Sequence, residues 1–395
     1  MRPQLEVADI FRVHGAAYRE ARRVSAADEA VMRHIASCRT RALGGHLDVC
    51  DACGPIRISY NSCRDRHCPK CQNLERARWL EARRDRLLPV PYFHVVAAPP
   101  HDLNGITLQN REVVYDILFR SVSETLLTIA ADPKHLGAQI GFTAILHTWG
   151  QDLRFHPHLH CVVTGGGLSR DGTRWIAARE SFFLPVKVLA KMFRGKFLAY
   201  LREAYDEGRL VFRGKTAALA ERTAFRRFVG GLYRKDWIVH AKPPFGGAEH
   251  VFRYLGRYTH RVAISNGRLI SMESGRVRFE KKDYADGGRR KVEDLPALEF
   301  IRRFLLHRLP KRFIRIRHYG LLAGRNVKGK LEQARALLVS PRRTNPSEQR
   351  AKRTWAERYR DLTGIDIMAC PRCGRALVRL PLREPDTPKA EAASA

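Results

Sequence analysis

Apolar residues recur at two different spacings along the chain, and each spacing predicts one type of element. Where they recur three and four residues apart they predict helices, because such positions share one helix face. Residues 111–130 follow this spacing through Val114, Ile117, Leu118, Val122 and Leu126, with Asn110 as a candidate N-cap. Further helices are predicted over residues 1–36, 73–88, 187–205, 246–261 and 329–339.

Other segments are short, rich in β-branched and aromatic residues and bounded by glycine or proline, which predicts strands. They cover residues 92–101, 141–148, 158–164, 173–178, 236–244 and 275–281. Asn266-Gly267 lies between two strand-like runs and predicts a hairpin over 262–271. Helices mixed with hairpin-connected strands favour an α+β fold on an antiparallel sheet over a doubly wound sheet.

Amino-acid composition and net charge indicate the class of protein and the type of partner it binds. The chain has 395 residues, of which 44% are hydrophobic, enough for two or three globular domains. It carries 72 Lys and Arg against 40 Asp and Glu, a formal net charge of +32, which indicates a polyanionic partner. The arginines are spread along the whole chain, so nucleic acid is favoured over a membrane. A basic scaffold resting on an anionic surface is the alternative.

The N-terminal residues contain no apolar run of signal-peptide length, and no window of the sequence approaches a transmembrane span. We therefore expect a soluble, cytoplasmic protein without a membrane partner. The last eleven residues, 385–395, are polar and are expected to be disordered. In a reducing compartment, closely spaced cysteines indicate metal binding instead of disulfides.

Six of the nine cysteines fall between residues 38 and 71. Cys50-x-x-Cys53 and Cys68-x-x-Cys71 are separated by 14 residues, a spacing that fits a tetrahedral zinc site made of four cysteines. Coincidental reduced cysteines are the alternative. Because such a site has no open coordination position, its zinc would be structural and would stabilise a small basic module that can bind DNA.

Four more ligand-type residues surround these cysteines and predict a second structural zinc. His34 and Cys38 are four residues apart, and so are Cys63 and His67, so that each pair could present its ligands from one helix face. His46 could replace one of the histidines, and His67 could instead only pack. Cys370-x-x-Cys373 is half a site, for which metal binding and a turn without metal both remain open.

A second cluster of ligand-type residues is the run "FHPHLHCVV" at 155–163. Alternate residues of a strand point to one face, so His158 and His160 would hold a divalent ion between them. The preceding strand supplies His147, and Gln151 follows it; either could complete the coordination. A packed polar pair is one alternative. A cupin-like or carbonic-anhydrase-like zinc centre is another, but it would need three dedicated ligands and a small-molecule pocket that the charge does not suggest.

The segment "FRYLGRYTHR" at 252–261 carries two tyrosines. Tyr254 and Tyr258 are four residues apart and would share a helix face, among Arg253, Arg257 and Arg261. A phenolate that attacks phosphorus forms a phosphotyrosine, while the guanidinium groups hold phosphates. Core packing of both rings is the alternative. Further candidate residues are Lys242, Arg315 and Arg317 for DNA binding and Tyr319 as a weaker nucleophile.

These motifs together resemble the HUH endonuclease superfamily. His158-Leu159-His160 is similar to its His-hydrophobic-His signature and Tyr254-x-x-x-Tyr258 to its two-tyrosine branch. From about residue 30 to 340 the chain resembles rolling-circle insertion-sequence transposases with an N-terminal zinc-binding domain. The resemblance implies a ferredoxin-like or RRM-like palm, Mg²⁺ or Mn²⁺ at the histidines with Gln151 as third ligand and His147 in reserve, and a 5′-phosphotyrosine intermediate on single-stranded DNA.

The resulting prediction is a transposase with three parts. Residues 1–80 form a helical and zinc-binding module, 90–345 the catalytic domain, and 346–395 a basic extension. Its partners are single-stranded DNA at element ends and target, with host replication proteins as further candidates. A replication initiator or relaxase, and a non-catalytic zinc-bearing nucleic-acid binder, are the alternatives; the lack of a G-x-x-x-x-G-K-[ST] motif excludes a fused helicase. The DNA sequence recognised, the oligomeric state and the activity of this copy stay open.

Overall fold

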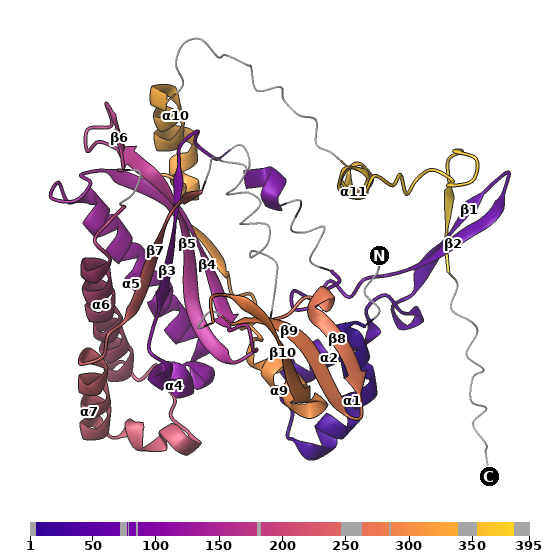
Figure 1. Ribbon diagram of the computed structural model, residues 1–395, viewed down its shortest axis with the longest axis horizontal. Coiled ribbons are helices and arrows are strands. Elements are labelled where there is room, and N and C mark those ends of the chain that lie inside the picture. Colours follow the sequence, from indigo (N-terminus) through magenta and orange to yellow (C-terminus); the bar gives the residue numbers. More distant parts are fainter. Residues whose placement is uncertain are drawn as a thin grey trace.

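The computed structural model contains three antiparallel sheets and the helices that pack on them (Figure 1). It describes residues 5–71, 77, 79–83, 86–179, 183–245, 263–283, 286–338 and 354–382. Helices are mixed with consecutive antiparallel strands along the chain, which confirms the predicted α+β class. In this part of the chain no helix is long and apolar enough to span a membrane.

The largest sheet has the strand order β11-β4-β5-β3-β7, with every neighbouring pair antiparallel. Its strands are β3 (Tyr92–Ala98), β4 (Gln139–Trp149), β5 (Phe155–Leu168), β7 (Ile238–Phe245) and β11 (Ile316–Gly320), and the short β6 (Trp175–Ala177) pairs with β5. One helical connection joins β3 to β4 and another joins β5 to β7. The order β4-β5-β3-β7 is therefore that of the ferredoxin-like βαββαβ unit expected from the resemblance.

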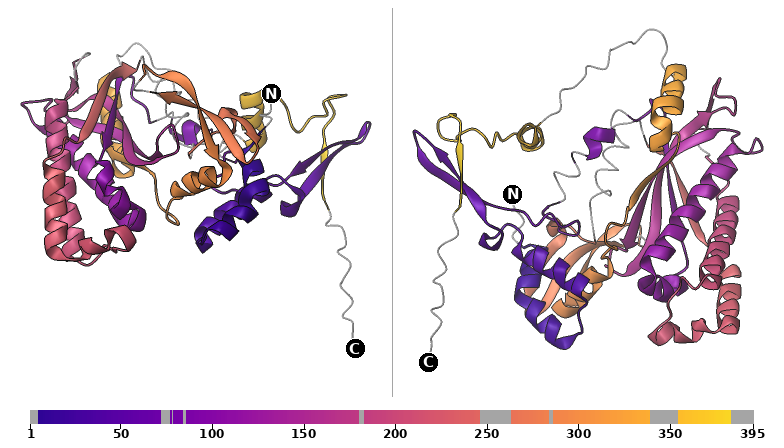
Figure 2. Two further views of the ribbon diagram at one scale, coloured as in Figure 1. Left: turned by 60° about the horizontal axis from the view of Figure 1, so that its bottom comes forward. Right: turned by 180° about the vertical axis from the view of Figure 1, so that it is seen from behind.

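Helices cover one face of this sheet. They are α4 (Asn104–Gln109), α5 (Arg111–Ala131), α6 (Val186–Asp206) and α7 (Arg222–Tyr233), and Figure 2 shows them on the same side of the strands. Leu159, Cys161 and Val163 of β5 lie in the core beneath them. Because side chains alternate along a strand, the intervening histidines point to the opposite face, here called the histidine face.

One half of the histidine face is covered by apolar side chains. Tyr92, Ile145 and Val162 form a buried cluster with Leu321 and Leu331, beside helix α10 (Glu332–Leu338). The histidines lie in the other half of that face, toward the turn between β4 and β5. The sheet thus has a hydrophobic core on one side and a partly polar surface on the other.

A second core joins the N-terminal helices to elements more than 230 positions later. Helices α1 (Val7–Ala21) and α2 (Ala26–Ser37) share it with α9 (Ala297–Leu306) and the sheet β10-β9-β8, formed by β8 (Leu269–Glu273), β9 (Arg276–Asp283) and β10 (Arg289–Pro296). Phe11 packs edge-on against Phe304, with ring centroids 5.4 Å apart. The three-part boundaries at 1–80, 90–345 and 346–395 remain a prediction.

The third sheet has the order β12-β1-β2 and joins the two ends of the chain. It consists of β1 (Gly45–Cys50), β2 (Gly54–Tyr60) and β12 (Val378–Pro381), next to α11 (Trp355–Thr363). Figure 1 shows it apart from the large sheet, beyond the N-terminal helices. The C-terminal segment therefore returns to the cysteine-rich region.

The hairpin predicted at Asn266-Gly267 is wrong. Residues Asn266–Arg268 form a 3-10 turn, and the Asn266 side-chain oxygen accepts a hydrogen bond from the Val7 backbone N–H. The hairpin lies one turn later, between β8 and β9, where Ser274 and Gly275 have φ angles of 48° and 71°. A contact with the distant N-terminal helix thus overrides the local turn preference of Asn-Gly.

Candidate active site and cysteine clusters

Three histidines converge on the histidine face. His147 on β4 pairs in register with His158 on β5, and His160 follows on the same side of β5. Their ligand nitrogens all lie within 4.8 Å of one another, and Nε2 of His158 is 2.9 Å from Nε2 of His160. The structure thus brings together both residues of the predicted pair and His147.

Hydrogen bonds orient two of these imidazoles. The His158 Nδ1–H donates to the backbone oxygen of His156 at 2.7 Å, which leaves Nε2 with its lone pair. His160 Nδ1 lies 2.8 Å from Nε2 of His94 on β3, and the two rings are stacked. If this Nδ1 carries the proton, Nε2 of His160 keeps its lone pair on the side that faces His158. Such outer hydrogen bonds fix the tautomer of metal-binding histidines.

Burial keeps these imidazoles neutral. It lowers the pKa of His158 to about 3 and that of His94 to about 4, and it holds the pKa of His160 well below its usual value. The neutral form is the one that donates an electron pair to a metal. The neutral imidazoles of His158 and His160, with His147 on the adjacent strand, therefore fit a divalent transition-metal ion.

Sequence reasoning missed His94. It lies in the buried strand β3, its side chain is 4% exposed, and it hydrogen-bonds His160. The available signal was a histidine at an alternating position of an otherwise apolar strand. Gln151, the predicted third ligand, lies in the turn after β4, where its backbone oxygen accepts a hydrogen bond from Arg268. The geometry favours His147 over Gln151 as the third ligand.

Both predicted nucleophiles, Tyr254 and Tyr258, lie outside the described residues, as do Arg253, Arg257 and Arg261. The described residues on either side of them can be located. Phe245, the last residue of β7, pairs with Tyr92, which pairs with Thr164 near the far end of β5. Arg268 bonds to Gln151 in the turn that precedes β5. Phe245 and Arg268, which are described, thus lie near opposite ends of β5.

The other candidate DNA-binding residues lie in different environments. Lys242 of β7 is exposed and pairs in register with His94, so it borders the histidines. Arg317 instead forms an ion pair with Asp116 of α5, which places it on the helix-covered side, and Arg315 is 6% exposed. Burial lowers the pKa of Arg315 to about 9. Of the three, only Lys242 is placed to reach DNA at the histidine face.

Tyr319 is the weaker nucleophile candidate. Its ring stacks on Phe142 with centroids 5.0 Å apart, against the helix-side core, and burial raises its pKa. A phenol with a raised pKa is a poorer source of phenolate. The structure therefore favours the packing role for Tyr319.

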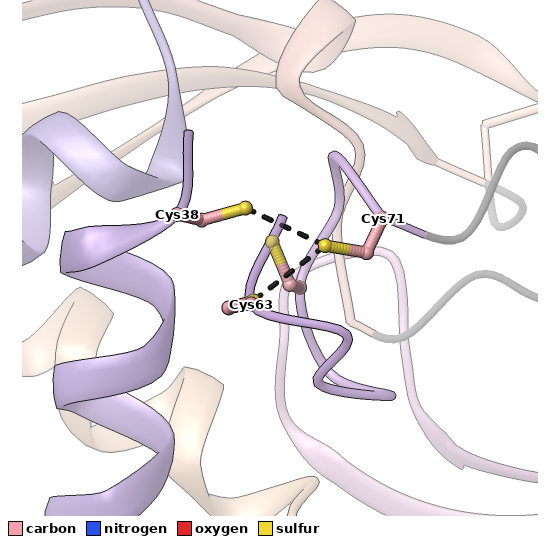
Figure 3. A group of neighbouring side chains, drawn as sticks. Cys38, Cys63 and Cys71 are labelled. Atoms are coloured by element: carbon pink, nitrogen blue, oxygen red, sulfur yellow. Dashed lines mark hydrogen bonds between the residues drawn. The ribbon is translucent and has the colours of Figure 1, made fainter. Parts of the chain in front are cut away.

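The first cysteine cluster consists of Cys38, Cys63, Cys68 and Cys71. Cys38 follows the end of α2 and the other three lie in the loop after β2. Figure 3 shows the sulfur atoms of Cys38, Cys63 and Cys71 turned toward one another. Sγ of Cys71 is 3.4 Å from that of Cys38 and 3.5 Å from that of Cys63. A tetrahedron of Zn–S bonds has sulfur–sulfur edges of about 3.8 Å, so the four sulfurs fit one zinc ion.

This cluster corrects both predicted ligand sets. Cys68 and Cys71 lie with Cys38 and Cys63, whereas Cys50 and Cys53 lie with Cys370 and Cys373 in a second cluster. The predicted set of Cys50, Cys53, Cys68 and Cys71 is therefore not brought together. The physical reason is the pairing of β12 with β1, which supplies a partner for the first CxxC pair from the other end of the chain.

His34, His67 and His46 are outside both clusters. The Asp65 carboxylate lies 2.9 Å from Nδ1 of His34 and 2.8 Å from Nδ1 of His67. Burial would raise the pKa of Asp65, but the hydrogen bonds to the two histidines hold it at about 2. Nε2 of His67 accepts a hydrogen bond from the Leu309 backbone N–H. His34 and His67 thus hold the cysteine-rich loop against neighbouring residues through hydrogen bonds. His46 lies elsewhere, with Nε2 4.0 Å from the Asp48 carboxylate.

The buried residue His307 is expected to make the free energy of unfolding depend on pH. His307 is 1% exposed, donates from Nε2 to the Leu153 oxygen and lies near Arg111 and Asp152; burial lowers its pKa to about 3. The unfolded chain binds this proton below about pH 6.5 and the folded chain does not, so the free energy of unfolding falls as pH drops from about 6.5 toward 3.

We expect this histidine to contribute up to about 1.4 kcal/mol per pH unit in that window. Urea unfolding of His307→Gln between pH 7 and pH 5 should show a shallower decline than the parent protein. His135→Gln, at an exposed position in the loop after α5, serves as the control and should leave the decline unchanged. Equal slopes for the parent and His307→Gln would contradict the prediction.

The comparisons with known proteins agree with this architecture. Residues 141–330 match the family model of a putative transposase, and residues 10–98 match that of a transposase zinc-binding domain. The chain is 56% identical over 369 residues to the putative transposase y4qJ of Sinorhizobium fredii, covering 93% of this chain and 92% of the relative. No solved structure matches the chain.

The chain is also 27% identical over 354 residues to the transposase for insertion sequence element IS801 of Pseudomonas savastanoi pv. phaseolicola, covering 89% of this chain and 82% of that protein. The two matched ranges contain the three histidines and the first cysteine cluster, respectively. The chain therefore belongs to the transposase family, with a transposase domain that follows a transposase zinc-binding domain.

Proposed function

We propose that this transposase nicks and rejoins single-stranded DNA through a phosphotyrosine intermediate, with a divalent metal ion held by His147, His158 and His160. The observation that carries the proposal is the convergence of three imidazoles on one face of the sheet, with His147 and His158 buried and His160 half-buried. A ferredoxin-like sheet with histidines on the face opposite its helices is also what the resemblance to HUH enzymes implies. Movement of the element by a rolling-circle-type mechanism belongs to the same proposal.

The histidines would act as metal ligands, and His94 as a positioning residue that keeps His160 in the ligating tautomer. When bound, a divalent ion supplies positive charge to the non-bridging phosphate oxygens and so stabilises the transition state. Lys242, exposed beside His94, is placed to contact a DNA phosphate. Nitrogen ligands prefer transition metals, so Mn²⁺ is favoured over Mg²⁺.

Tyr254 and Tyr258 are the proposed nucleophiles. The phenolate oxygen of one tyrosine attacks phosphorus, an O–P bond to the tyrosine forms, and the bond from phosphorus to the 3′ oxygen breaks. The 3′ oxygen leaves and takes up a proton, while the 5′ end stays on the enzyme. The energy of the broken phosphodiester is retained for rejoining, and the second tyrosine, four residues away in the sequence, would cut again before the first adduct is resolved.

The same chemistry would also serve a replication initiator or relaxase. The family, and the naming of both relatives as transposases, favour transposition. The cysteine cluster at Cys38, Cys63, Cys68 and Cys71 would hold a structural zinc, because four thiolates leave no open coordination position. In this proposal the zinc shapes the N-terminal domain and takes no part in the chemistry.

Covalent trapping tests the chemistry. The purified protein is incubated with Mn²⁺ and labelled single-stranded DNA from an element end, and adducts that resist SDS are counted with and without EDTA. We expect an adduct only with metal, and mass spectrometry should find nucleotide on Tyr254 or Tyr258. An active preparation that forms no metal-dependent adduct, or forms one on neither tyrosine, would contradict the proposal.

Substitution of the tyrosines tests their division of labour. We expect Tyr254→Phe and Tyr258→Phe each to retain part of the adduct in vitro but to reduce transposition sharply, because each leaves one nucleophile for two cuts. The double change should abolish the adduct. Tyr319→Phe, in the helix-side core, is the matched control and should leave the adduct yield unchanged. Nucleotide found on Tyr258 alone would refute the two-nucleophile scheme.

A further inference from the structure

Two cysteine pairs from opposite ends of the chain meet at the third sheet. Cys50 and Cys53 lie at the turn between β1 and β2, and Cys370 and Cys373 lie in a turn shortly before β12. Their sulfur atoms are all within 4.8 Å of one another. We propose that these four cysteines bind a second structural zinc ion, which joins the C-terminal segment 354–382 to the N-terminal zinc-binding domain.

The two pairs are built alike. Both have the sequence Cys-x-x-Cys-Gly, and the glycines Gly54 and Gly374 have φ angles of 73° and 76°, in the left-handed region that favours glycine. In the second pair the Arg372 backbone N–H donates to the Cys370 sulfur at 3.4 Å, and the Gly374 N–H donates to the Cys370 oxygen at 2.8 Å. Backbone N–H groups directed at sulfur stabilise the thiolate that a metal requires.

The sulfur–sulfur separation fits a metal and not a disulfide. Sγ of Cys50 is 3.5 Å from Sγ of Cys373, near the edge of about 3.8 Å expected around a tetrahedral zinc ion. A disulfide bond is about 2.05 Å long and would use only two of the four sulfurs. Four converging thiols are therefore explained by one metal ion.

Within the described residues, this sheet has only a small hydrophobic core. Its cluster of buried residues comprises Cys50, Cys370 and Leu377, with Cys53 and Ile56 packed against them. The side chains of Val378 and Leu380 on β12 are about half exposed, at 57% and 46%. Modules with so little buried apolar surface usually need a metal or disulfides to fold, and structural zinc supplies that free energy.

Hydrogen bonds between charged side chains stabilise the pairing of β12 with β1. Asp48 of β1 is 1% exposed and accepts hydrogen bonds from Arg57 of β2 at 2.7 Å and from Arg379 of β12 at 2.9 Å. Arg375, beside the second pair, lies 3.6 Å from Asp51, inside the first pair. The Asp48 carboxylate thus links all three strands, and the two cysteine pairs are held face to face.

Counting zinc in the full-length protein tests the proposal. Protein purified under reducing conditions should contain two zinc ions per chain by inductively coupled plasma mass spectrometry. Cys373→Ala should lower the count to one, whereas Cys373→His should keep two because imidazole can replace a thiolate. Cys161→Ala is the control, since Cys161 lies in the core of the large sheet and in neither cluster, and it should also keep two.

Absorption spectra of the cobalt-loaded protein and amide hydrogen exchange identify which metal site is lost. Cobalt-loaded parent protein should show the charge-transfer absorption of thiolate ligands at both sites, and Cys373→Ala should lose about half of it. Amide exchange should rise in residues 45–60 and 366–382 and stay unchanged in β3, β4 and β5. One zinc in the parent protein, or two in Cys373→Ala, would overturn the proposal. Adduct formation is not used as a readout, so this result is independent of the proposed DNA chemistry.

Discussion

His158→Ala and His160→Ala are each expected to reduce single-strand nicking about 10³-fold. Either change removes one of the three imidazoles that lie within 4.8 Å of one another, and the metal ion held there would be bound weakly or displaced. Charge stabilisation by a metal ion is worth several kcal/mol, and each 1.36 kcal/mol corresponds to a tenfold change in rate. The loss should appear in the initial rate of nicking at saturating single-stranded DNA.

DNA binding should be nearly unaffected in the same variants. Binding rests on Lys and Arg contacts to phosphates, and the net charge of +32 is unchanged when a neutral histidine is removed. His135→Ala, an exposed histidine in the loop after α5, is the matched control and should retain the parent rate. Nicking that survives either change at the parent rate would show that the histidines only pack against one another.

Cys68→Ser is expected to remove one zinc ion and to unfold the N-terminal domain. Cys68 is 1% exposed and belongs to the cluster that fastens the end of α2 to the loop after β2. Structural zinc binding contributes about 10–16 kcal/mol in small zinc-binding peptides, comparable to or larger than the total stability of a typical domain. The remaining hydrogen bonds, such as those of Asp65 to His34 and His67, cannot replace that contribution.

Metal analysis and amide hydrogen exchange measure this effect together. We expect the zinc content to fall by one ion per chain and exchange to rise throughout α1, α2 and residues 61–71. The strands of the large sheet should keep their protection, because their core is separate from that of the N-terminal helices. Cys161→Ser, outside both cysteine clusters, should retain the zinc of the parent protein. Retention of full zinc by Cys68→Ser would exclude this cluster as a zinc site.

Local pattern predicted most of the large sheet. The alternation in "FHPHLHCVV" placed His158 and His160 on the face opposite Leu159 and Cys161, because a strand allows only two faces. Local pattern was less informative where a side chain bonds to a distant residue. Asn110 occupies the predicted N-cap position of α5, but its side chain makes no capping hydrogen bond and bonds to Ile106 and Val211 instead.

The sequence by itself determined the α+β class, the histidine pair and the presence of metal-binding cysteine pairs, because these follow from spacing within a few residues. Only the tertiary structure decided which cysteines share a cluster, since Cys50 and Cys370 are brought together by a strand pairing between the two ends of the chain. It likewise decided that His94 supports His160, through strands that are neighbours in the sheet but 66 residues apart in sequence. Contacts of this kind depend on strand order, which short-range spacing does not specify.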